Sequence, residues 1–321
     1  MYNKDTRNSG LSMTSESNQP LVYGIVLNWN GYEDTVSCLD SLRQMKYDNF
    51  RIVVVDNGSE DGSGSRLDNE YQNVDVLFNR ENRGFAGGMN TGIRFAIDSG
   101  ADYVWVLNND TVVPSDSNPV SHLIAPLMER PDIGITSPVI LKHDTNLVWF
   151  WKAEVNSYTL NAKHVNQWEE LDDFSKKTKE VMTGYIPLCA AMIDVDVIND
   201  VGLLNEQYFL YYEDVDFSMR VKKHGYELLT RTDTEVEHKV SQSTGSNLDP
   251  LNSYYAARNR ILFRREIDGT NSKIYFIISY LIWLVLLTGH RIIHRKGEGL
   301  LALLRGTWDG IRSRTGKGPY P

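Results

Sequence analysis

The segment Tyr103–Thr111 constrains the fold more than any other stretch of the sequence. Five apolar residues are followed directly by Asn108, Asn109 and Asp110. A short, uniformly apolar run that ends in a polar turn is typical of a buried parallel strand. In open α/β sheets, ligands bind at the carboxyl ends of such strands. The segment therefore predicts an α/β fold in which one carboxylate and two amides face a ligand crevice.

The chain before this segment repeats the arrangement twice. An apolar strand predicted at 21–27 ends at Asn28, and another predicted at 50–55 ends at Asp56 and Asn57. A helical pattern of apolar residues separates the two strands. Strands that alternate with helices in this way predict a largely parallel sheet of the nucleotide-binding kind.

A third short strand is predicted at 74–78, and the loop after it leads through Arg83 and Gly84 into the next helix. The glycine-rich run 84–88 either lets phosphate groups approach the backbone at a helix start or packs the helix closely through small residues. Asp56 likewise either accepts hydrogen bonds from a base or ribose or caps its own turn. The residues expected to meet in one crevice are Asn28, Asp56, Arg83 and Asp110.

Further elements continue the domain toward the C-terminus. A helix and a returning strand are predicted within 114–141, and a hairpin with a loop excursion within 148–182. A strand is predicted at 185–193, followed by a short helix that Asp194 caps and Gly202 ends.

Three carboxylates then crowd the first turn of a predicted helix, at Glu213, Asp214 and Asp216. Acids at a helix N-terminus are favoured by the helix dipole without any function. Clustered carboxylates also raise one another's pKa, as a general base requires. His238 follows later in the chain and is either a structural residue or a ligand for a Mn²⁺-like metal.

Composition excludes several classes of protein. The formal net charge of −9 and the pI near 5.3 argue against nucleic-acid binding, which requires a basic surface. The two cysteines, Cys38 and Cys189, form neither a disulfide framework nor a zinc site and fit a reducing compartment. Residues 1–20 are polar and without an apolar signal segment, so they are predicted to be a disordered tail.

The C-terminal region differs from the rest of the chain in charge and hydropathy. Residues 274–289 form an almost uncharged apolar run, shorter than the ~20 residues that span a bilayer. The region 291–317 carries a net charge of +5 from seven Lys/Arg and two acids. It also contains an apolar set, which comprises Leu300, Leu301, Leu303, Leu304 and Trp308. A buried core helix is the structural alternative, but the basic amphipathic pattern favours membrane association, either interfacial or spanning.

Five motifs in one order give the sequence a resemblance to a known family. They are Asn28-Trp29-Asn30, Asp56–Ser63, Asn82–Asn90, Asn108-Asn109-Asp110 and Tyr211–Asp216. In this order they resemble glycosyltransferase family 2, which is inverting, and within it the rhamnosyltransferase-type members that assemble surface polysaccharides and lipid-linked glycans. The resemblance runs from Leu21 to about Arg265 and implies a GT-A fold.

The resemblance also implies roles for individual residues. Asp56 would contact the nucleotide base, Asp110 and His238 would hold a Mn²⁺ or Mg²⁺ ion, and Asp214 would be the catalytic base with Glu213 as its partner. The remaining residues expected to bind substrate are Asn28, Asn57, Arg83, Gly84, Asn108, Asn109 and Asp216. Asn-Asn-Asp stands where the family's general metal motif is Asp-x-Asp, which leaves less protein charge at the metal.

These observations predict a GT-A catalytic domain at 21–265 and a membrane-associated helical region at 266–321. The expected activity is transfer of one sugar from a UDP- or dTDP-linked donor to a lipid-linked glycan acceptor, in protein glycosylation or surface polysaccharide assembly. The expected location is the cytoplasmic face of the cell membrane. Two alternatives remain open at this point: a sugar nucleotidyltransferase, and a non-catalytic glycan-binding protein on the same fold.

Overall fold

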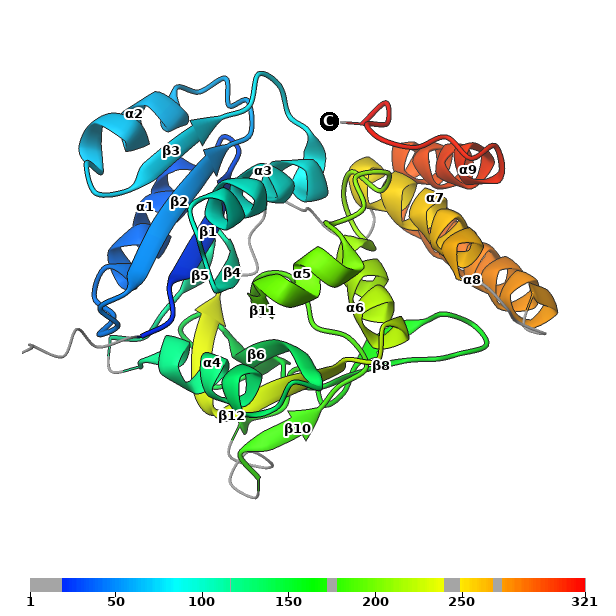
Figure 1. The fold of residues 1–321 in the computed structure, drawn as a ribbon. Coiled ribbons are helices and arrows are strands. Elements are labelled where there is room, and N and C mark those ends of the chain that lie inside the picture. Colours follow the sequence, from blue (N-terminus) through cyan, green and yellow to red (C-terminus); the bar gives the residue numbers. More distant parts are fainter. Residues whose placement is uncertain (1–18, 116, 172–177, 240–248, 268–272, 321) are drawn as a thin grey trace, which may run out of the picture.

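A ten-stranded mixed sheet forms the centre of the computed structural model, which describes residues 19–115, 117–171, 178–239, 249–267 and 273–320 (Figure 1). The strands are β1 (Val22–Asn28), β2 (Phe50–Asp56), β3 (Asp75–Phe78), β4 (Tyr103–Asn108), β5 (Thr111–Val112), β6 (Ile133–Lys142), β7 (Val148–Phe150), β8 (Ala153–Val155), β9 (Ala162–His164), β10 (Glu180–Met182), β11 (Ala190–Asp194) and β12 (Glu227–His238). The helices are α1 (Tyr32–Leu42), α2 (Ser63–Glu70), α3 (Gly84–Asp98), α4 (Pro119–Glu129), α5 (Val195–Val201), α6 (Glu213–Lys223), α7 (Pro250–Glu266), α8 (Lys273–Ile293) and α9 (Gly297–Ile311). The predicted α/β class is confirmed. Residues 1–18 of the predicted tail lie outside the described residues.

The order of strands in the large sheet is β10-β12-β6-β11-β4-β1-β2-β3, with β5 paired to β12 and β7 to β6. The pairs β4-β1, β1-β2 and β2-β3 are parallel, as the sequence predicts. In this register Asn28 lies opposite Asp56, and Asn108 lies opposite Leu27. The polar residues that end these strands therefore gather at one edge.

The strand β11 is antiparallel to both β4 and β6, so the sheet is mixed rather than wholly parallel. The strand β12 runs parallel to β6 and brings His238 to the end of the sheet where β5 begins. The excursion predicted at 148–182 contains β7, the small β8-β9 hairpin and β10; residues 172–177 within it are outside the described part.

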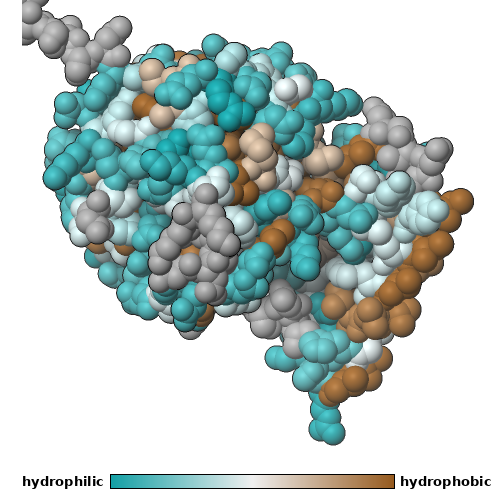
Figure 2. Space-filling model, turned by 90° about the horizontal axis from the view of Figure 1, so that it is seen from below, coloured by the Kyte–Doolittle hydropathy of each residue, from teal (hydrophilic) through white to brown (hydrophobic). Residues whose placement is uncertain are grey.

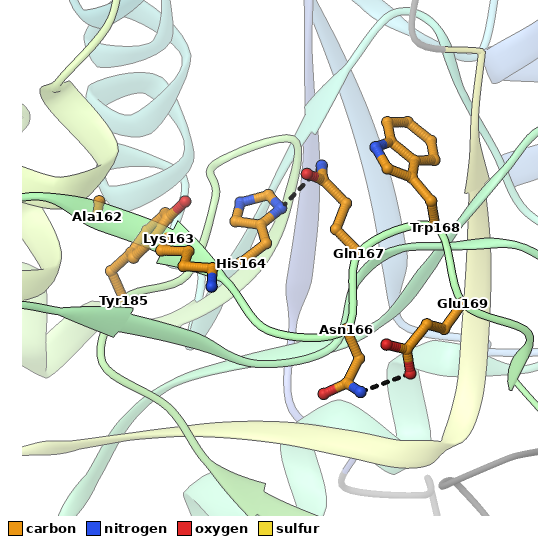
Figure 3. A pocket seen from close by; sticks show the side chains of 8 residues that line it. All are labelled: Ala162, Lys163, His164, Asn166, Gln167, Trp168, Glu169 and Tyr185. Carbon is orange, nitrogen blue, oxygen red and sulfur yellow. Dashed lines mark hydrogen bonds between the residues drawn. The ribbon is translucent and has the colours of Figure 1, made fainter.

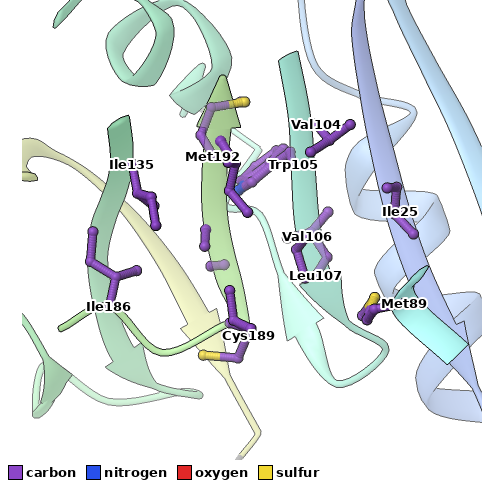
Figure 4. Packing of buried hydrophobic residues seen from close by; sticks show 14 of the residues in the cluster. Ile25, Met89, Val104, Trp105, Val106, Leu107, Ile135, Ile186, Cys189 and Met192 are labelled. Carbon is purple, nitrogen blue, oxygen red and sulfur yellow. The ribbon is translucent and has the colours of Figure 1, made fainter. Parts of the chain in front are cut away.

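The main hydrophobic core lies on both faces of the sheet. Val104, Trp105, Val106 and Leu107 of β4 are all fully buried, which explains the uninterrupted apolar run. Side chains of β4 and β11 pack together in the middle of the sheet (Figure 4). The helix α3 packs so closely on β1 that a Cβ on Gly92 would lie 2.4 Å from Ile25 Cγ2.

The three C-terminal helices pack beside one another at one end of the molecule (Figure 1). The helix α9 approaches α7 closely, since a Cβ on Gly306 would lie 2.2 Å from the carbonyl oxygen of Tyr254. Within the described residues, α8 is the one helix long and apolar enough to cross a membrane, and 17% of its apolar window is buried.

The outward face of α8 and α9 is strongly apolar. Figure 2 shows hydrophobic side chains in a band along this edge of the molecule. We call this band the apolar face; its members, each about half exposed or more, are Ile274, Tyr275, Ile277, Ile278, Leu281, Ile282, Val285, Leu286, Ile292, Ile293, Leu301, Leu304, Trp308 and Ile311. The apolar set predicted in α9 is divided, because Leu303 is fully buried. Arg291, counted with the basic tail, is also buried.

Candidate active site

The adjacent ends of β1 and β2 are joined by a buried hydrogen-bond network. The side-chain nitrogen of Asn28 donates to Asp56 Oδ1 at 2.8 Å and to Ser63 Oγ at 2.8 Å. Its oxygen accepts from the Thr35 hydroxyl at 2.9 Å. Asn28 is fully buried and positions Asp56. The expected role of Asn28 in substrate binding stays a prediction.

Asp56 is also held by the turn that follows it. Its Oδ2 accepts from the backbone N–H of Ser59 at 3.2 Å, so the turn-capping role is present. The start of α2 lies against the same carboxylate, since a Cβ on Gly64 would lie 2.5 Å from Asp56 Cγ. Asp56 is thus a fixed acceptor at the strand end.

Asn57 shapes the loop that leads into α3. Its nitrogen donates to the carbonyl of Gly84 at 3.0 Å, and its oxygen accepts from the backbone N–H of Arg83 at 3.2 Å. Arg83 turns away to Glu206, with its Nη2 3.0 Å from Glu206 Oε2. Arg83 therefore takes part in an ion pair here, and its expected role in substrate binding stays a prediction.

Gly84 meets a strict steric demand. Its φ of +74° is the left-handed conformation, and a Cβ would lie 2.2 Å from the carbonyl oxygen of Phe209. The neighbouring N–H of Phe85 donates to that carbonyl at 2.7 Å. The glycine therefore allows the start of α3 to touch the segment that precedes α6.

A cavity of about 260 Å³ opens at this edge of the sheet. Four predicted substrate-binding residues line it: Asn57, Gly84, Asn108 and Asn109. Asn109 donates to the Thr35 hydroxyl at 3.1 Å, and a Cβ on Gly31 would lie 2.5 Å from its nitrogen. We call this space the donor cavity. It adjoins the end of β4, where Asn108 lies 3.5 Å from His238 Nε2.

Asp110 and His238 come together although they are far apart in sequence. His238 Nε2 lies 2.9 Å from Asp110 Oδ1, and both residues are buried. The His238 ring packs edge-on against Trp149 with centroids 4.9 Å apart. Its Nδ1 is buried and has no hydrogen-bond partner among the described residues.

This pair fits a divalent cation. Neighbouring ligands of an octahedral ion with bonds of about 2.1 Å lie about 3.0 Å apart, and the Asp110–His238 separation matches that spacing. A carboxylate oxygen with an imidazole nitrogen also suits Mn²⁺ better than a purely oxygen-seeking ion.

The other acidic centre lies at the first turn of α6. Burial raises the pKa of Glu213 to about 8 and that of Asp214 to about 6, and the negative charge of Asp214 adds to the rise at Glu213. The backbone N–H of Val215 donates to Asp214 Oδ1 at 2.7 Å and opposes the rise. Near neutral pH the pair therefore carries one proton, on Glu213, and Asp214 is ionised.

Asp216 belongs to a structural network instead. Its oxygens accept from the Tyr208 hydroxyl at 3.1 Å and from Arg220 Nε at 2.9 Å. The carboxylate of Asp216 is buried against these partners and is not part of the cavity that Asp214 lines. The side chain of Asp216 thus faces inward, and its expected role in substrate binding stays a prediction.

The two acidic centres both lie near Cys189. Burial raises the pKa of the Cys189 thiol well above its usual value, and the charges of Asp110 and Asp214 both add to the rise. The thiol is therefore close to both carboxylates. Asp214 also lines a cavity of about 530 Å³ that extends from α6 to Arg260 and Trp283; we call it the acceptor cavity.

A more open hollow of about 600 Å³ adjoins the acceptor cavity through Ala162 and Tyr185. Its lining comes mainly from the segment around β9, and the indole of Trp168 stands beside Gln167 and Glu169 (Figure 3). Trp168 is 47% exposed, so an aromatic face is available for contact with a sugar.

Sequence reasoning missed the contribution of α7. The side-chain nitrogen of Asn259 donates to the carbonyls of Tyr208, Leu210 and Tyr211 at 3.0, 2.7 and 2.9 Å. Arg258 Nη2 donates to the Tyr208 carbonyl at 2.6 Å. These side chains fix the loop that leads to Asp214. The available signal was the polar run 258–260 inside an otherwise apolar helical pattern.

Comparison with known proteins relates the chain to sugar transferases. Residues 25–180 match the family model described as Glycosyl transferase family 2. The chain is 22% identical over 311 residues to the dTDP-rhamnosyl transferase RfbF of Shigella flexneri, covering 93% of this chain and 98% of the relative. It is 26% identical over 224 residues to an N-acetylglucosaminyl-diphospho-decaprenol L-rhamnosyltransferase of Mycobacterium tuberculosis, covering 65% and 72%.

Among solved structures, the mannosyltransferase PcManGT from Pyrobaculum calidifontis, in complex with GDP-Man and Mn²⁺, superposes with a TM-score of 0.57 at 17% identity. The superposition covers 92% of this chain and 88% of that one. The shared architecture confirms the expected GT-A fold.

Proposed function

Because the chain is a glycosyltransferase of family 2, we propose that it transfers one sugar, with inversion, from a uridine- or thymidine-diphosphate sugar to a lipid-linked glycan acceptor. The observation that carries this proposal is the buried pair of Glu213 and Asp214 lining a cavity, and the pair would share a crevice with Asp110 because Asp110 and Asp214 both lie near Cys189. Such a crevice can hold a departing diphosphate at one end and a proton acceptor at the other.

The donor would lie along the ends of β1, β2 and β4. Asp56 offers a fixed carboxylate to the nucleotide, and Asn28 and Asn57 keep that edge rigid. The amides of Asn108 and Asn109 line the donor cavity, where they can reach the sugar or its phosphates. The relative from S. flexneri is named for a thymidine-linked donor.

Asp110 and His238 would hold a divalent cation, Mn²⁺ or Mg²⁺. When bound, such a cation neutralises the charge of the departing diphosphate. The structurally similar mannosyltransferase was solved with Mn²⁺.

Asp214 would take the proton from the acceptor hydroxyl as that oxygen attacks the anomeric carbon. Its raised pKa of about 6 makes it a better proton acceptor than an exposed aspartate and still leaves it ionised at neutral pH. Glu213 remains protonated beside it, so a second negative charge does not enter the buried site. Attack from the face opposite the diphosphate produces inversion in one displacement.

A lipid-linked acceptor is supported by the apolar face of α8 and α9. Exposed basic residues flank this face, namely Lys273, Arg295, Lys296, Arg305 and Arg312. An exposed apolar band bordered by Lys and Arg suits the interface of an anionic membrane. The mycobacterial relative is named for a decaprenol-linked substrate. We place the enzyme on the cytoplasmic face, where its buried free cysteines, Cys38 and Cys189, suit a reducing environment.

The test is transfer of labelled sugar from uridine-, thymidine- and guanosine-diphosphate donors, with Mn²⁺ or Mg²⁺ and native membranes, into lipid extract. We expect label in the extract with one donor, and its loss with a chelator or in Asp214→Asn. The matched control is Asp40→Asn, an acid of α1 outside the crevice, which should keep activity. Label only in water-soluble product would refute the lipid acceptor, and full activity of Asp110→Ala would refute the metal site.

The alternatives left open by the sequence have no feature in their favour. The family match and the named relatives are transferases, which speaks against a non-catalytic glycan-binding protein. A sugar nucleotidyltransferase would leave the buried Glu213–Asp214 pair without a role.

A further inference from the structure

A buried arginine that lines the acceptor cavity has no acidic partner among the described residues. Arg260, on α7, is 3% exposed. Its Nη2 donates to Asn161 Oδ1, and its Nε has no hydrogen-bond partner in the part of the chain that the structure describes. Within the described residues no carboxylate forms an ion pair with it. A buried cation with an unsatisfied donor is costly unless an anion completes the site.

The surroundings of Arg260 are aromatic. The guanidinium carbon lies 5.1 Å from the ring centroid of Trp283, 5.8 Å from Tyr280 and 5.9 Å from Phe276, all on α8. Burial lowers the pKa of Arg260, and among neighbouring groups only the hydroxyls of Tyr212 and Tyr280 act against it. Aromatic contacts hold the side chain in place without neutralising its charge.

Arg260 lines the acceptor cavity together with Asp214. Asp214 enters this space from the first turn of α6, whereas Arg260 enters it from α7 beside Trp283, so the acid and the cation line different parts of the cavity. An acceptor with a hydroxyl at one end and an anionic group further along would match both ends. Phosphate is well suited to the arginine end, because a guanidinium can donate two parallel hydrogen bonds to it.

A second cavity, of about 260 Å³, continues from the arginine end. It shares Asn252, Ala256 and Trp283 with the acceptor cavity and adds Ser253, Leu287, Arg291 and Leu303. Leu287 belongs to α8, whose outer side is the apolar face. One wall of this cavity, formed by Trp283, Leu287 and Leu303, is therefore apolar and suits a hydrocarbon chain, while Asn252, Ser253 and Arg291 make the rest polar.

We propose that Arg260 binds the phosphate group next to the lipid of the acceptor, with the first part of a prenyl chain lying against Trp283 and Leu287. This proposal rests on the proposed function and specifies its acceptor as a prenyl phosphate or diphosphate sugar. The sugar hydroxyl would then reach Asp214 at the far end of the same cavity.

The test measures direct binding, so it does not depend on transfer. The full-length protein in detergent, without donor and with a chelator present, is titrated by calorimetry with farnesyl diphosphate, farnesol and inorganic pyrophosphate. We expect farnesyl diphosphate to bind wild-type protein more tightly than either of the other two. Arg260→Met should weaken the binding of farnesyl diphosphate at least tenfold, about 1.4 kcal/mol, and leave the affinity for farnesol unchanged.

Arg265→Met is the matched control, because Arg265 is an exposed arginine of the same helix. It should bind farnesyl diphosphate as wild-type protein does. Arg260→Gln serves as a second uncharged variant, and thermal melting of each variant identifies any that does not fold.

Equal affinity of wild-type protein and both Arg260 variants for farnesyl diphosphate would overturn the proposal. Pyrophosphate binding as tightly as farnesyl diphosphate would also overturn it, because the ligand would then be a free phosphate. Loss of sugar transfer with this binding intact would count against the proposed function alone.

Discussion

The proton on Glu213 predicts an unusual dependence of stability on pH. Its pKa rises from 4.5, the value for an unperturbed glutamate, to about 8 in the folded protein. Between these values the unfolded chain releases a proton that the folded chain keeps. Folding stability therefore falls as pH rises from about 4.5 to 8, and Glu213→Gln should remove this loss.

The size of the effect follows from the same shift. One pKa unit corresponds to about 1.4 kcal/mol, so an isolated shift of this size is worth on the order of 5 kcal/mol. Asp214 shares the proton and reduces the share that belongs to Glu213 alone, so a value of roughly 3 kcal/mol is expected. In a chain of this size each kcal/mol moves the Tm by about 2 °C.

The assay is thermal unfolding of wild-type protein and Glu213→Gln at a series of pH values from 5 to 9. Between the acid and the alkaline end of this series, the Tm of wild-type protein should fall by roughly 5 °C more than the Tm of the variant. Titration of groups that do not interact with Glu213 cancels in the difference. Asp216→Asn should instead lower the Tm, since it weakens the partner of Arg220. A Tm difference between Glu213→Gln and wild type that stays constant with pH would refute the reasoning.

Four other outcomes are expected. The logarithm of kcat/KM should rise with unit slope as pH increases toward about 6 and Asp214 ionises, and the rise should be missing in Asp214→Asn. A flat pH profile in wild-type protein would contradict the role of Asp214 as the base. His238→Ala should weaken Mn²⁺ binding, followed by electron paramagnetic resonance, by roughly 10–100-fold; an unchanged titration removes His238 from the metal site. Gly84→Ala should lower the free energy of unfolding, measured with denaturant, by about 2 kcal/mol or more. Gly100 also has a positive φ, but a Cβ there would have no neighbour within 4 Å, so Gly100→Ala should cost less stability. Equal losses of stability would show that the close approach at Gly84 is unimportant. Leu281→Glu should reduce flotation with anionic vesicles and leave transfer to a water-soluble acceptor analogue intact; unchanged flotation contradicts the membrane face.

The ends of the parallel strands could be predicted because each signal is local. An apolar run followed by a polar turn identifies β1, β2 and β4, and parallel pairing then brings Asp56 and Asp110 to the same edge. The crowding of Glu213 and Asp214 is likewise visible in adjacent residues. These inferences required no knowledge of distant contacts.

The remaining features depend on contacts between distant residues. Arg83 forms an ion pair with Glu206, which lies 123 positions away in the sequence. No local sequence pattern distinguishes that ion pair from a contact with phosphate. Asp216 turns inward because Tyr208 and Arg220 lie beside it after folding. Arg260 resembles a solvated helix residue in the sequence, and its burial follows only from the packing of α8 over α7.

The hydrogen bonds from Asn259 to the loop before α6 limit how the protein can be shortened. The loop contains Phe209, Tyr211 and Tyr212 at positive φ, a conformation that side-chain-bearing residues adopt only when other contacts enforce it. The amide of Asn259, which enforces it, belongs to the helix that packs against α9. A soluble version made by removing the helices from α7 onward would therefore lose more than its attachment to a lipid surface, because the loop would relax and carry Asp214 out of line. Solubility is better sought by substituting exposed leucines and isoleucines with polar residues while all three helices stay in place.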